Sequence, residues 1–309
     1  MPELPDITVY VERLSVLIGG RTLEQIRIIN PFVLRSVDPP ADTFAGRSVE
    51  KIHRLGKRIV LECPDELYVV MHLMKAGRLH WTPGGPGASP RRRSSLATLN
   101  FAHGTLTLTE AGRHRRASLH LVRGRDHLRA DHDRGGLEVF EADAAAFRAA
   151  LQRENRTLKR ALTNPRTFSG IGNAYSDEIL HAALLSPVQL THNLNDGEID
   201  RLWASARSVL TAWTDRLRDE VGDGLPEKVT AFHPQMAVHG RYRQPCPRCG
   251  APVQRIVYRS RETNYCAPCQ TGGRLLADRA LSRLLRADWP RTLEEWEDGE
   301  RQRVRGGTA

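Results

Sequence analysis

Apolar side chains recur at helical spacing near the start of the chain. Between residues 5 and 18 they stand three or four positions apart, at Ile7, Tyr10, Val11, Leu14, Leu17 and Ile18. This spacing gathers them on one helical face, and Gly19-Gly20 stops the run. The sequence therefore predicts an N-terminal helix over 5–18.

From Leu23 to about Val122 the pattern changes to short apolar runs. These runs include RIVLEC, LYVVMHL, LATLNF and GTLTLTE, and Gly, Pro and Asp turns separate them. Such runs are typical of strands, so this part predicts a β-rich domain. Within it, residues 82–95 (TPGGPGASPRRRSS) are too polar and too broken for a core and predict a basic loop.

After Gly135-Gly136 the pattern becomes helical. The helical runs are ADAAAFRAALQRE, TLKRALTN, NAYSDEILHAALL and an amphipathic stretch from Asp196 to about Glu220. Residues 222–245 are rich in Gly, Pro and Gln, and a cysteine segment and the helix-like ADRALSRLLR follow. We expect a multi-domain α+β chain: a helix plus β-rich domain at 1–135, a helical domain at 136–240, the cysteine segment at 241–276 and a helix-like, charged end at 277–309.

Four of the five cysteines form the strongest local motif. Their spacing is Cys246-x2-Cys249-x16-Cys266-x2-Cys269. Each Cys-x2-Cys pair forms a tight turn, or knuckle, and two knuckles across a β-hairpin bring four thiolates to one Zn²⁺. A shell of four protein ligands leaves no position for a reacting water. A redox pair or chance clustering is disfavoured, because Pro247, Gly250 and Pro268 supply turns at both knuckles. The motif predicts one structural zinc.

The net charge indicates the class of partner. Lys and Arg total 46 against 36 Asp and Glu, so the formal charge is 46 − 36 = +10, which favours a polyanion. No apolar run approaches the roughly 18 residues that span a bilayer, and the first residues lack the cationic start and apolar core of a secretory signal. We expect no membrane contact and a cytoplasmic location, which also suits reduced cysteines.

Three further features carry possible chemistry. If Met1 is removed, Pro2 becomes a secondary amine beside the Glu3 carboxylate, and such an amine forms a cationic iminium with an aldehyde-level carbon. The stretch GIGN places Gly170, Gly172 and Asn173 where a helix N-terminus could bind a phosphate, or merely connect two helices. Arg255, Arg259 and Arg261 lie between the cysteine knuckles, where they could grip phosphates or form a solvated charged face.

Five segments in order carry a family resemblance: MPELPD at the start, LGKRIV at 55–60, HLMKAGRL at 72–79, FSGIGNAYSDEIL at 168–180 and RETNYCAPCQ at the end of the cysteine segment. Together they resemble the formamidopyrimidine-DNA glycosylase and endonuclease VIII family over residues 1 to about 276. The resemblance implies a β-sandwich behind an N-terminal helix, a helix–two-turn–helix domain and a zinc ribbon. It also implies a monomeric enzyme of base excision repair that acts on damaged DNA, double- or single-stranded, at the nucleoid if the cell is bacterial.

The resemblance implies a role for individual residues. Pro2 corresponds to the Schiff-base nucleophile and Glu3 to the general acid/base, while Lys57 and Arg261 correspond to phosphate-gripping residues that support elimination. His72, Lys159 and Asn173 correspond to contacts with the DNA backbone. The stretch at about 222–237 corresponds to the loop on which lesion choice depends in this family.

Two departures from the family pattern concern the device that fills the gap left by a flipped nucleotide. The family's Met is one residue early, at Met74, and Lys75 stands in its place. In TEAGRHRRASL, His114 or Ala117 falls near the expected aromatic residue, and Arg113, Arg115 and Arg116 are candidates for the expected Arg. An apolar wedge is therefore missing or rebuilt with charge, and we expect a wider range of substrates. Asp6 also replaces the family's usual Glu.

Two alternatives remain open. A catalytically silent damaged-DNA-binding protein would share the fold, although the Pro2, Glu3, Lys57 and Arg261 set argues against it. A zinc-ribbon RNA-binding protein would share the charge and the cysteines, but it has no use for an N-terminal Pro-Glu pair. Trapping of a covalent adduct between the protein and abasic-site DNA would distinguish the enzyme from both alternatives.

Overall fold

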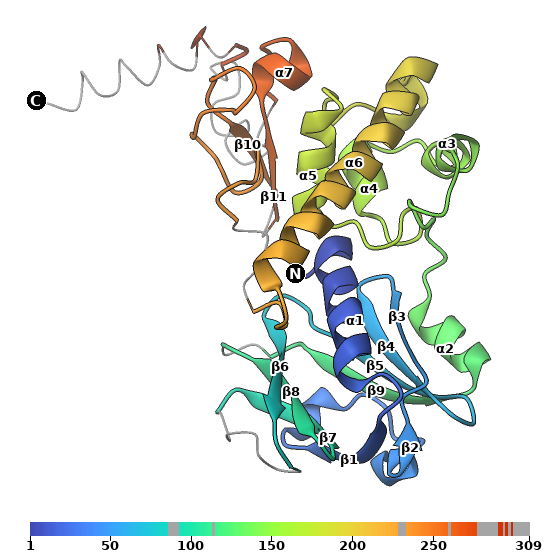
Figure 1. Cartoon of the computed structure of the whole chain (residues 1–309). Helices are drawn as coiled ribbons and strands as arrows, with labels where there is room; N and C mark the ends of the chain where they lie inside the picture. The colour runs from blue at the N-terminus through green and yellow to red at the C-terminus, as the bar shows by residue number, and fades with distance from the viewer. Residues whose placement is uncertain are drawn as a thin grey trace, which may run out of the picture. The chain divides into compact units, whose positions relative to one another are not determined.

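The structure is a computed structural model that describes residues 1–85, 93–112, 115–227, 233–258, 261–276, 290–292, 294–295 and 298 (Figure 1), with residues 258 and 261 described by their backbone alone. The chain forms two compact units. Unit 1 comprises Met1–Gly136 and Leu210–Thr230, and unit 2 comprises Leu137–Val209 and Ala231–Ala309. In the described part of the chain, no helix combines the length and apolar character needed to cross a membrane.

Unit 1 begins with helix α1 (Leu4–Ile18), as the spacing of apolar residues predicts. Its buried face includes Ile7, Leu14 and Ile18, which are fully shielded from solvent. The helix ends at Gly19, whose N–H donates to the Ser15 carbonyl. A Cβ at this position would lie 2.4 Å from the same carbonyl oxygen, so the close approach requires glycine.

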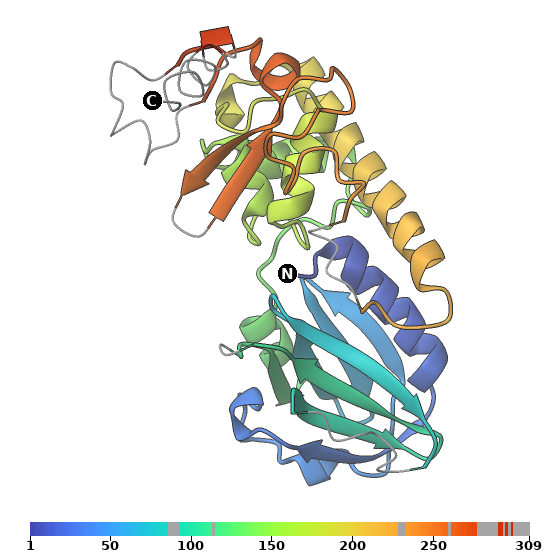
Figure 2. The same cartoon turned by 90° about the vertical axis from the view of Figure 1, so that its left-hand side faces the viewer.

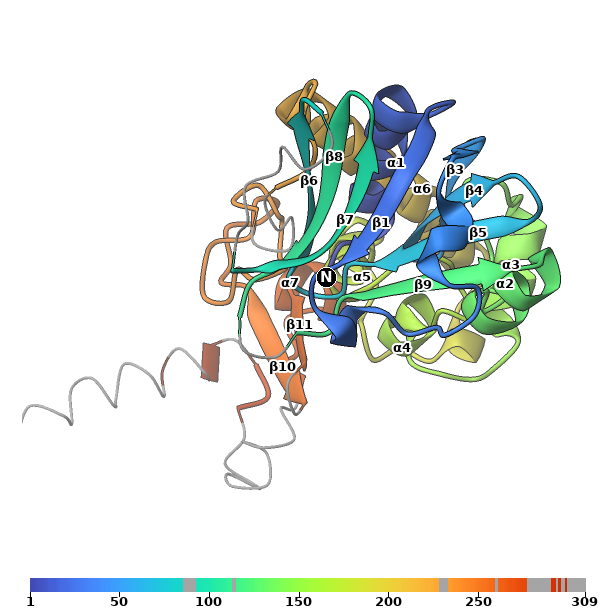
Figure 3. The same cartoon turned by 90° about the horizontal axis from the view of Figure 1, so that it is seen from below.

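Two antiparallel sheets make up most of unit 1 (Figure 3). The first has the order β2 (Arg47–Ser48), β1 (Thr22–Ile28), β7 (Ser95–Phe101), β8 (Gly104–Glu110), β6 (Gly77–Pro83). The second has the order β3 (Lys51–Leu55), β4 (Arg58–Cys63), β5 (Leu67–His72), β9 (Ser118–Arg123). Inward-facing residues of both sheets and of α1 form one hydrophobic cluster. The predicted β-sandwich with its N-terminal helix is therefore confirmed.

Some connections in unit 1 differ from the sequence prediction. The 82–95 loop is shorter at both ends, because Thr82 and Pro83 belong to β6 and Ser95 starts β7; residues 86–92 lie outside the described residues. Helix α2 (Arg125–His132) follows β9 and was not predicted. Only Leu128 and His132 of α2 are buried, so its sequence carries almost no apolar periodicity. Unit 1 also contains two short 3₁₀ turns, η1 (Pro31–Val33) and η2 (Ala41–Phe44), and the second part of α6 (Asp196–Val221).

Unit 2 contains the predicted helices and the predicted ribbon. The helices are α3 (Ala144–Gln152), α4 (Leu158–Thr163), α5 (Asn173–Ala182) and the first part of α6 (Asp196–Val221), with the 3₁₀ turn η3 (Thr191–Asn193) between α5 and α6. Strands β10 (Gln254–Tyr258) and β11 (Arg261–Tyr265) form a two-stranded ribbon, drawn in orange in Figure 2, and α7 (Ala267–Thr271) follows. The helix expected within 277–286 lies outside the described residues.

Candidate functional site

The N-terminus of α1 holds the predicted catalytic pair. Pro2 is buried, and Glu3 is only 3% exposed as the residue that caps the helix. Glu3 and Asp6 form a reciprocal capping box: the Glu3 N–H donates to Asp6 Oδ2 at 2.8 Å, and the Glu3 carboxylate accepts the N–H of Asp6. Asp6 therefore makes a hydrogen bond that fixes the backbone of Glu3. The carboxylate of Glu3 is held beside the first residues of the chain.

Four charged side chains act on the N-terminal amine. Burial lowers the pKa of the Met1 amino group; Glu3 and Asp6 raise it, while Arg78 and Lys57 lower it further. A lowered pKa increases the neutral, nucleophilic fraction of an amine near pH 7. Removal of Met1 would expose the Pro2 nitrogen, which directly precedes Glu3.

Lys57 lies in the tight turn that joins β3 to β4. Leu55 pairs with Arg58, so Gly56 and Lys57 form a two-residue hairpin loop. Gly56 has a φ of 61°, which suits a turn with glycine at its first central position. Arg54 braces the turn, because its Nη1 donates to the Gly56 carbonyl at 2.9 Å. The turn places the half-buried Lys57 within electrostatic reach of the amine.

His72 ends β5 and belongs to a cluster of cation-forming groups. Burial lowers its pKa to about 4, and Arg58, Lys57, His120 and His132 lower it further. The rings of His120 and His132 lie edge to face, 4.7 Å apart, and Arg58 Nη1 donates to the His132 carbonyl at 3.3 Å. The cluster combines a guanidinium with imidazole N–H donors, a combination that suits a phosphate oxygen. Sequence reasoning missed Arg58, His120 and His132, although strand alternation could have placed Arg58 and His120 on the face of His72.

The residues expected to form the wedge belong to two connections of unit 1, the β5–β6 turn and the β8–β9 loop. In the β5–β6 turn, Met74 is half-buried with a φ of 53°, whereas Lys75 is exposed. Gly77 closes this turn by donating its N–H to the Leu73 carbonyl at 2.8 Å. In this turn the cationic Lys75 is therefore more exposed than the apolar Met74.

In the β8–β9 loop, the buried Glu110 carboxylate accepts the N–H groups of Arg116 and Ala117 at 2.6 and 2.8 Å. Ala117 is 3% exposed and packs in the core of unit 1, which rules it out as an exposed wedge residue. Arg115 is exposed, and its Nη2 donates to the Arg93 carbonyl at 2.9 Å. Arg113 and His114 lie outside the described residues.

In unit 2, the predicted DNA contacts Lys159 and Asn173 meet at the N-terminus of α5. Lys159 Nζ donates to Asp177 Oδ1 at 2.5 Å and to the Asn173 carbonyl at 2.7 Å. The fully buried Asp177 also binds His239 Nδ1 at 2.7 Å. Asn173 Nδ2 donates to the Glu262 carbonyl of β11 at 2.8 Å. Lys159 therefore joins α4 to α5, and Asn173 joins α5 to the ribbon.

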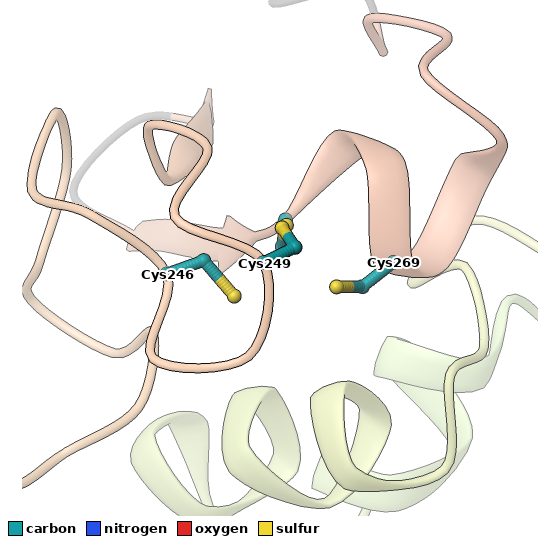
Figure 4. A group of neighbouring side chains, drawn as sticks. Cys246, Cys249 and Cys269 are labelled. Carbon is teal, nitrogen blue, oxygen red and sulfur yellow. The ribbon is translucent and has the colours of Figure 1, made fainter.

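The four cysteines lie close together, and Figure 4 shows Cys246 and Cys249 of the first knuckle near Cys269 of α7. Their sulfur atoms lie within 4.8 Å of one another. Tetrahedral Zn²⁺ with bonds of about 2.3 Å separates its sulfur ligands by roughly 3.8 Å, so the set fits one zinc ion. His181 of α5 also contacts the site, because its Nε2 lies 3.2 Å from Cys246 Sγ. Sequence reasoning missed His181, since nothing in its local pattern distinguishes it from a core histidine.

The ribbon arginines are only partly described. Arg261 starts β11, where its backbone pairs with Tyr258 at the tip-proximal end of the hairpin. Arg259 lies outside the described residues, as does the side chain of Arg261. Arg255 is exposed on β10, with its guanidinium carbon 4.2 Å from the centre of the Tyr242 ring. Of the predicted site residues, Pro2, Glu3, Lys57 and His72 thus belong to unit 1, and Lys159, Asn173, Arg261 and the four cysteines belong to unit 2.

Three family models match the chain in order. The N-terminal domain of formamidopyrimidine-DNA glycosylase matches residues 1–134, its helix–two-turn–helix domain matches 137–216, and a zinc finger found in this glycosylase and in isoleucyl-tRNA synthetase matches 243–272. The formamidopyrimidine-DNA glycosylase of Thermus thermophilus is 32% identical over 288 residues, which cover 88% of this chain and 100% of that protein. An uncharacterized formamidopyrimidine-DNA glycosylase-like protein of Mycobacterium tuberculosis is 40% identical over 150 residues, covering 48% of this chain and 91% of that protein.

Solved structures show the same fold. A Lactococcus lactis formamidopyrimidine-DNA glycosylase bound non-covalently to DNA with an abasic site has a TM-score of 0.75 and 24% identity, covering 87% of this chain and 99% of that one. The same enzyme with a DNA that contains N7-benzyl-Fapy-dG has a TM-score of 0.77, covering 87% and 100%. The order of the domains, the β-sandwich and the four-cysteine site all agree with this family. The matches also cover whole relatives. The chain belongs to the formamidopyrimidine-DNA glycosylase and endonuclease VIII family, a family of DNA glycosylases.

Proposed function

We propose that this protein is a bifunctional DNA glycosylase and abasic-site lyase that removes damaged bases through an N-terminal proline Schiff base. The observation that carries the proposal is the surroundings of the N-terminus. A buried carboxylate, Glu3, lies at the start of α1, where burial lowers the pKa of the Met1 amino group and Lys57 lowers it further; removal of Met1 would leave the Pro2 nitrogen directly before Glu3. This arrangement supplies a neutral amine nucleophile, a proton carrier and a cation at one place.

The proposed reaction begins with a nucleotide flipped out of the stack, because its C1′ is inaccessible inside a duplex. The Pro2 nitrogen attacks C1′, the glycosidic bond breaks, and the base leaves with that electron pair and takes up a proton from water. The Glu3 carboxylate accepts the proton that the attacking nitrogen loses and gives it to the ring oxygen; the bond between C1′ and the ring oxygen then breaks, and the nitrogen lone pair forms the iminium. The Glu3 carboxylate is suited to this role because its helix-capping hydrogen bonds fix its position.

Elimination follows from the iminium. The positive nitrogen acidifies the C2′ proton; its loss expels the 3′ phosphate, and loss of a C4′ proton then expels the 5′ phosphate. We assign Lys57 and Arg261 to the leaving phosphates, and His72, Lys159, Asn173, Arg113 and Arg115 to other backbone contacts. Lys159 is suited to such a contact only through the part of its ammonium that Asp177 and the Asn173 carbonyl leave open.

The zinc ion has a structural role in this proposal. Cys246, Cys249, Cys266 and Cys269 would hold it, and four thiolates leave no site for a substrate oxygen. The ion fixes the hairpin that carries Arg261. Cysteines kept as thiolates suit a reducing compartment, and we propose that the protein acts in the cytoplasm, at the nucleoid in a bacterial cell. We also propose that it acts as a monomer.

An exposed lysine in place of the expected apolar wedge supports a broad substrate range. Lys75 is exposed where the family's Met would stand, and Ala117 is buried. A flexible cation neutralises phosphates but fills a base-sized gap poorly, so the penalty for an unfavourable opposite base should be small. We propose damaged DNA, both double- and single-stranded, as the substrate class.

Borohydride trapping on an abasic-site oligonucleotide tests the proposal. Wild-type protein with Met1 removed, as verified by mass spectrometry, should give a covalent adduct on the N-terminal peptide. Pro2→Gly should weaken trapping greatly, and Glu3→Gln should slow base excision from a lesion panel. Glu24→Gln, at an exposed position, is the matched control and should trap like wild type. A processed, zinc-loaded wild type that binds abasic DNA without trapping would favour the silent DNA-binding alternative.

A further inference from the structure

The second sheet of unit 1 carries polar side chains at one end of its outer face. Ile59 of β4 pairs with Met71 of β5, and both belong to the hydrophobic cluster on the inner face. Arg58 precedes Ile59 and His72 follows Met71, so in antiparallel strands they are the next residues in the same direction. Since side chains alternate along a strand, Arg58 and His72 lie on the outer face. A guanidinium and an imidazole therefore occupy neighbouring strands there.

Strand β9 and helix α2 add two more imidazoles to this end. His120 pairs with Val70, which stands two residues before His72, so it shares the outer face. The His120 ring lies edge to face with the ring of His132, at 4.7 Å between centres. The His132 carbonyl accepts a hydrogen bond from Arg58 Nη1 at 3.3 Å. We call Arg58, His72, His120 and His132 the outer-face cluster, because backbone pairing and these two contacts join them.

Donors of the outer-face cluster lack acceptors within the protein. A guanidinium has five N–H donors, yet in the described part of the chain Arg58 makes one hydrogen bond, to the neutral His132 carbonyl, and no ion pair. Neither ring nitrogen of His72 has a hydrogen-bond partner among the described residues. Both side chains are half-buried, where polar groups are normally paired. An acceptor supplied by a ligand would satisfy them.

Positive charge surrounds the cluster, which indicates the sign of that ligand. The cations that act on the three imidazoles are Arg58 of β4, Lys57 of the β3–β4 turn, Arg35 beside β9 and Arg134 after α2. The acidic group that faces them in the described part of the chain is Asp131 of α2. Burial and the cations lower the pKa of all three imidazoles. Four cations against one carboxylate favour an anion.

We propose that the outer-face cluster binds one phosphate group of the DNA backbone and takes up a proton as it does so. Arg58 and the imidazole N–H groups of His72 and His120 would donate to the phosphate oxygens. The negative phosphate would stabilise an imidazolium, so a proton accompanies it. A backbone phosphate is favoured over free phosphate, because Lys57, assigned above to a DNA phosphate, directly precedes Arg58. The inference rests on DNA binding by the proposed function and adds Arg58 and His120 to it, independently of the lyase reaction.

The salt dependence of DNA binding tests the phosphate contact. Fluorescence anisotropy follows equilibrium binding to a duplex that carries a tetrahydrofuran analogue of an abasic site. Each phosphate contact contributes about 0.9 to the slope of log K against log salt concentration, so Arg58→Gln should reduce this slope by about 0.9. Loss of a charge-assisted bond should also weaken binding about tenfold. Arg123→Gln, at an exposed position of β9 at the opposite end of the sheet, is the matched control and should keep the wild-type slope.

The pH dependence of the same affinity tests proton uptake. A close negative charge shifts a pKa by about 1–3 units, so phosphate should raise the pKa of His72 from about 4 to about 6–7. Wild-type affinity should then be about threefold higher at pH 6 than at pH 7. His72→Asn and His120→Asn should each reduce this gain. His127→Asn, exposed on α2, is the matched control and should keep it.

The outcomes separate this site from the other proposals. An unchanged salt slope in Arg58→Gln overturns the phosphate contact, and an unchanged pH dependence in both histidine variants overturns proton uptake. Calorimetric titration with inorganic phosphate checks the source: binding that Arg58→Gln abolishes, with an unaltered DNA slope, would assign the site to free phosphate and overturn the proposal. If Arg58→Gln does not fold, His120→Asn decides by its pH dependence. Wild type that shows the expected slopes but does not trap abasic DNA contradicts the lyase function and supports this site.

Discussion

Glu178 offers the sharpest test of how unit 2 holds its ribbon. This residue of α5 is 5% exposed, and its two carboxylate oxygens accept three backbone N–H groups from residues 237–239. The distances are 2.7 Å from Ala237 and 2.9 Å from each of Val238 and His239. One side chain therefore fixes three consecutive residues that lead into the first cysteine knuckle.

The change Glu178→Gln keeps the shape and removes one acceptor oxygen. The amide NH₂ must face at least one N–H, and a buried donor without a partner costs about 1–3 kcal/mol. The remaining bonds change from charge-assisted to neutral, at about 1 kcal/mol each, while the neutral amide is easier to bury than the carboxylate. We expect a net loss of about 2–4 kcal/mol. For a unit of about 150 residues this lowers the melting temperature by roughly 5–12 °C.

Release of zinc on heating is the most specific assay, because Glu178 and all four cysteines belong to unit 2. A chromogenic chelator reports the release, and calorimetry reports the unfolding of the whole chain. Glu141→Gln, exposed in the same unit, is the matched control and should behave as wild type. If Glu178→Gln releases zinc within about 1 °C of wild type, the three hydrogen bonds do not fix the ribbon, and the reasoning is refuted.

Three further predictions follow from other contacts. His181→Ala should weaken zinc binding about 10–100-fold in chelator competition, because the ring contacts Cys246 Sγ, and unaltered affinity would contradict that role. The pKa of the buried His132 is lowered to about 4, so as the pH falls His132 is protonated in the unfolded chain before it is protonated in the folded chain. The unfolding free energy should therefore drop between pH 7 and pH 5, and His132→Asn should flatten this drop in urea titrations. Gly77→Ala should destabilise unit 1 by about 2–4 kcal/mol, since a Cβ would lie 2.3 Å from the Leu73 carbonyl oxygen; a normal urea midpoint would show that the turn can relax.

Sequence patterns predict the parts of this fold that depend on local chemistry. The α1 stripe at Ile7, Leu14 and Ile18 is periodic, and the four cysteines have fixed spacing, so both follow from position alone. Helix α2 could not be predicted, because only Leu128 and His132 are buried and tertiary packing determines its structure. The helix and the strands that the sequence predicts are those that bury a regular face.

Long-range contacts explain what the sequence could not predict about the site. Residues 222–245 have the composition of a linker, yet Leu225, Met236 and Val238 are buried. Arg78 stands in a motif recognised for other positions, and its bond to Glu227 joins residues 149 positions apart. Similarly, the sequence allows either His114 or Ala117 to align with the family's aromatic residue. Only the structure shows that Ala117 is buried and therefore is not an exposed wedge residue. In each case the decisive partner is distant along the chain, and no local period encodes it.

The division of α6 between the two units has a consequence for exchanging parts of this protein. The chain passes from one unit to the other at 136/137, 209/210 and 230/231, so neither unit is a continuous stretch of sequence. A fragment that ends at Gly136 would lack Leu225, a member of the sandwich core, and the backbone carbonyls that Tyr10 and Arg78 bind. A viable chimera with a relative must therefore carry residues 210–230 together with 1–136. Recombination at Gly136 alone would separate α1 and the sandwich from the segment that packs against them, so these two stretches should be inherited together.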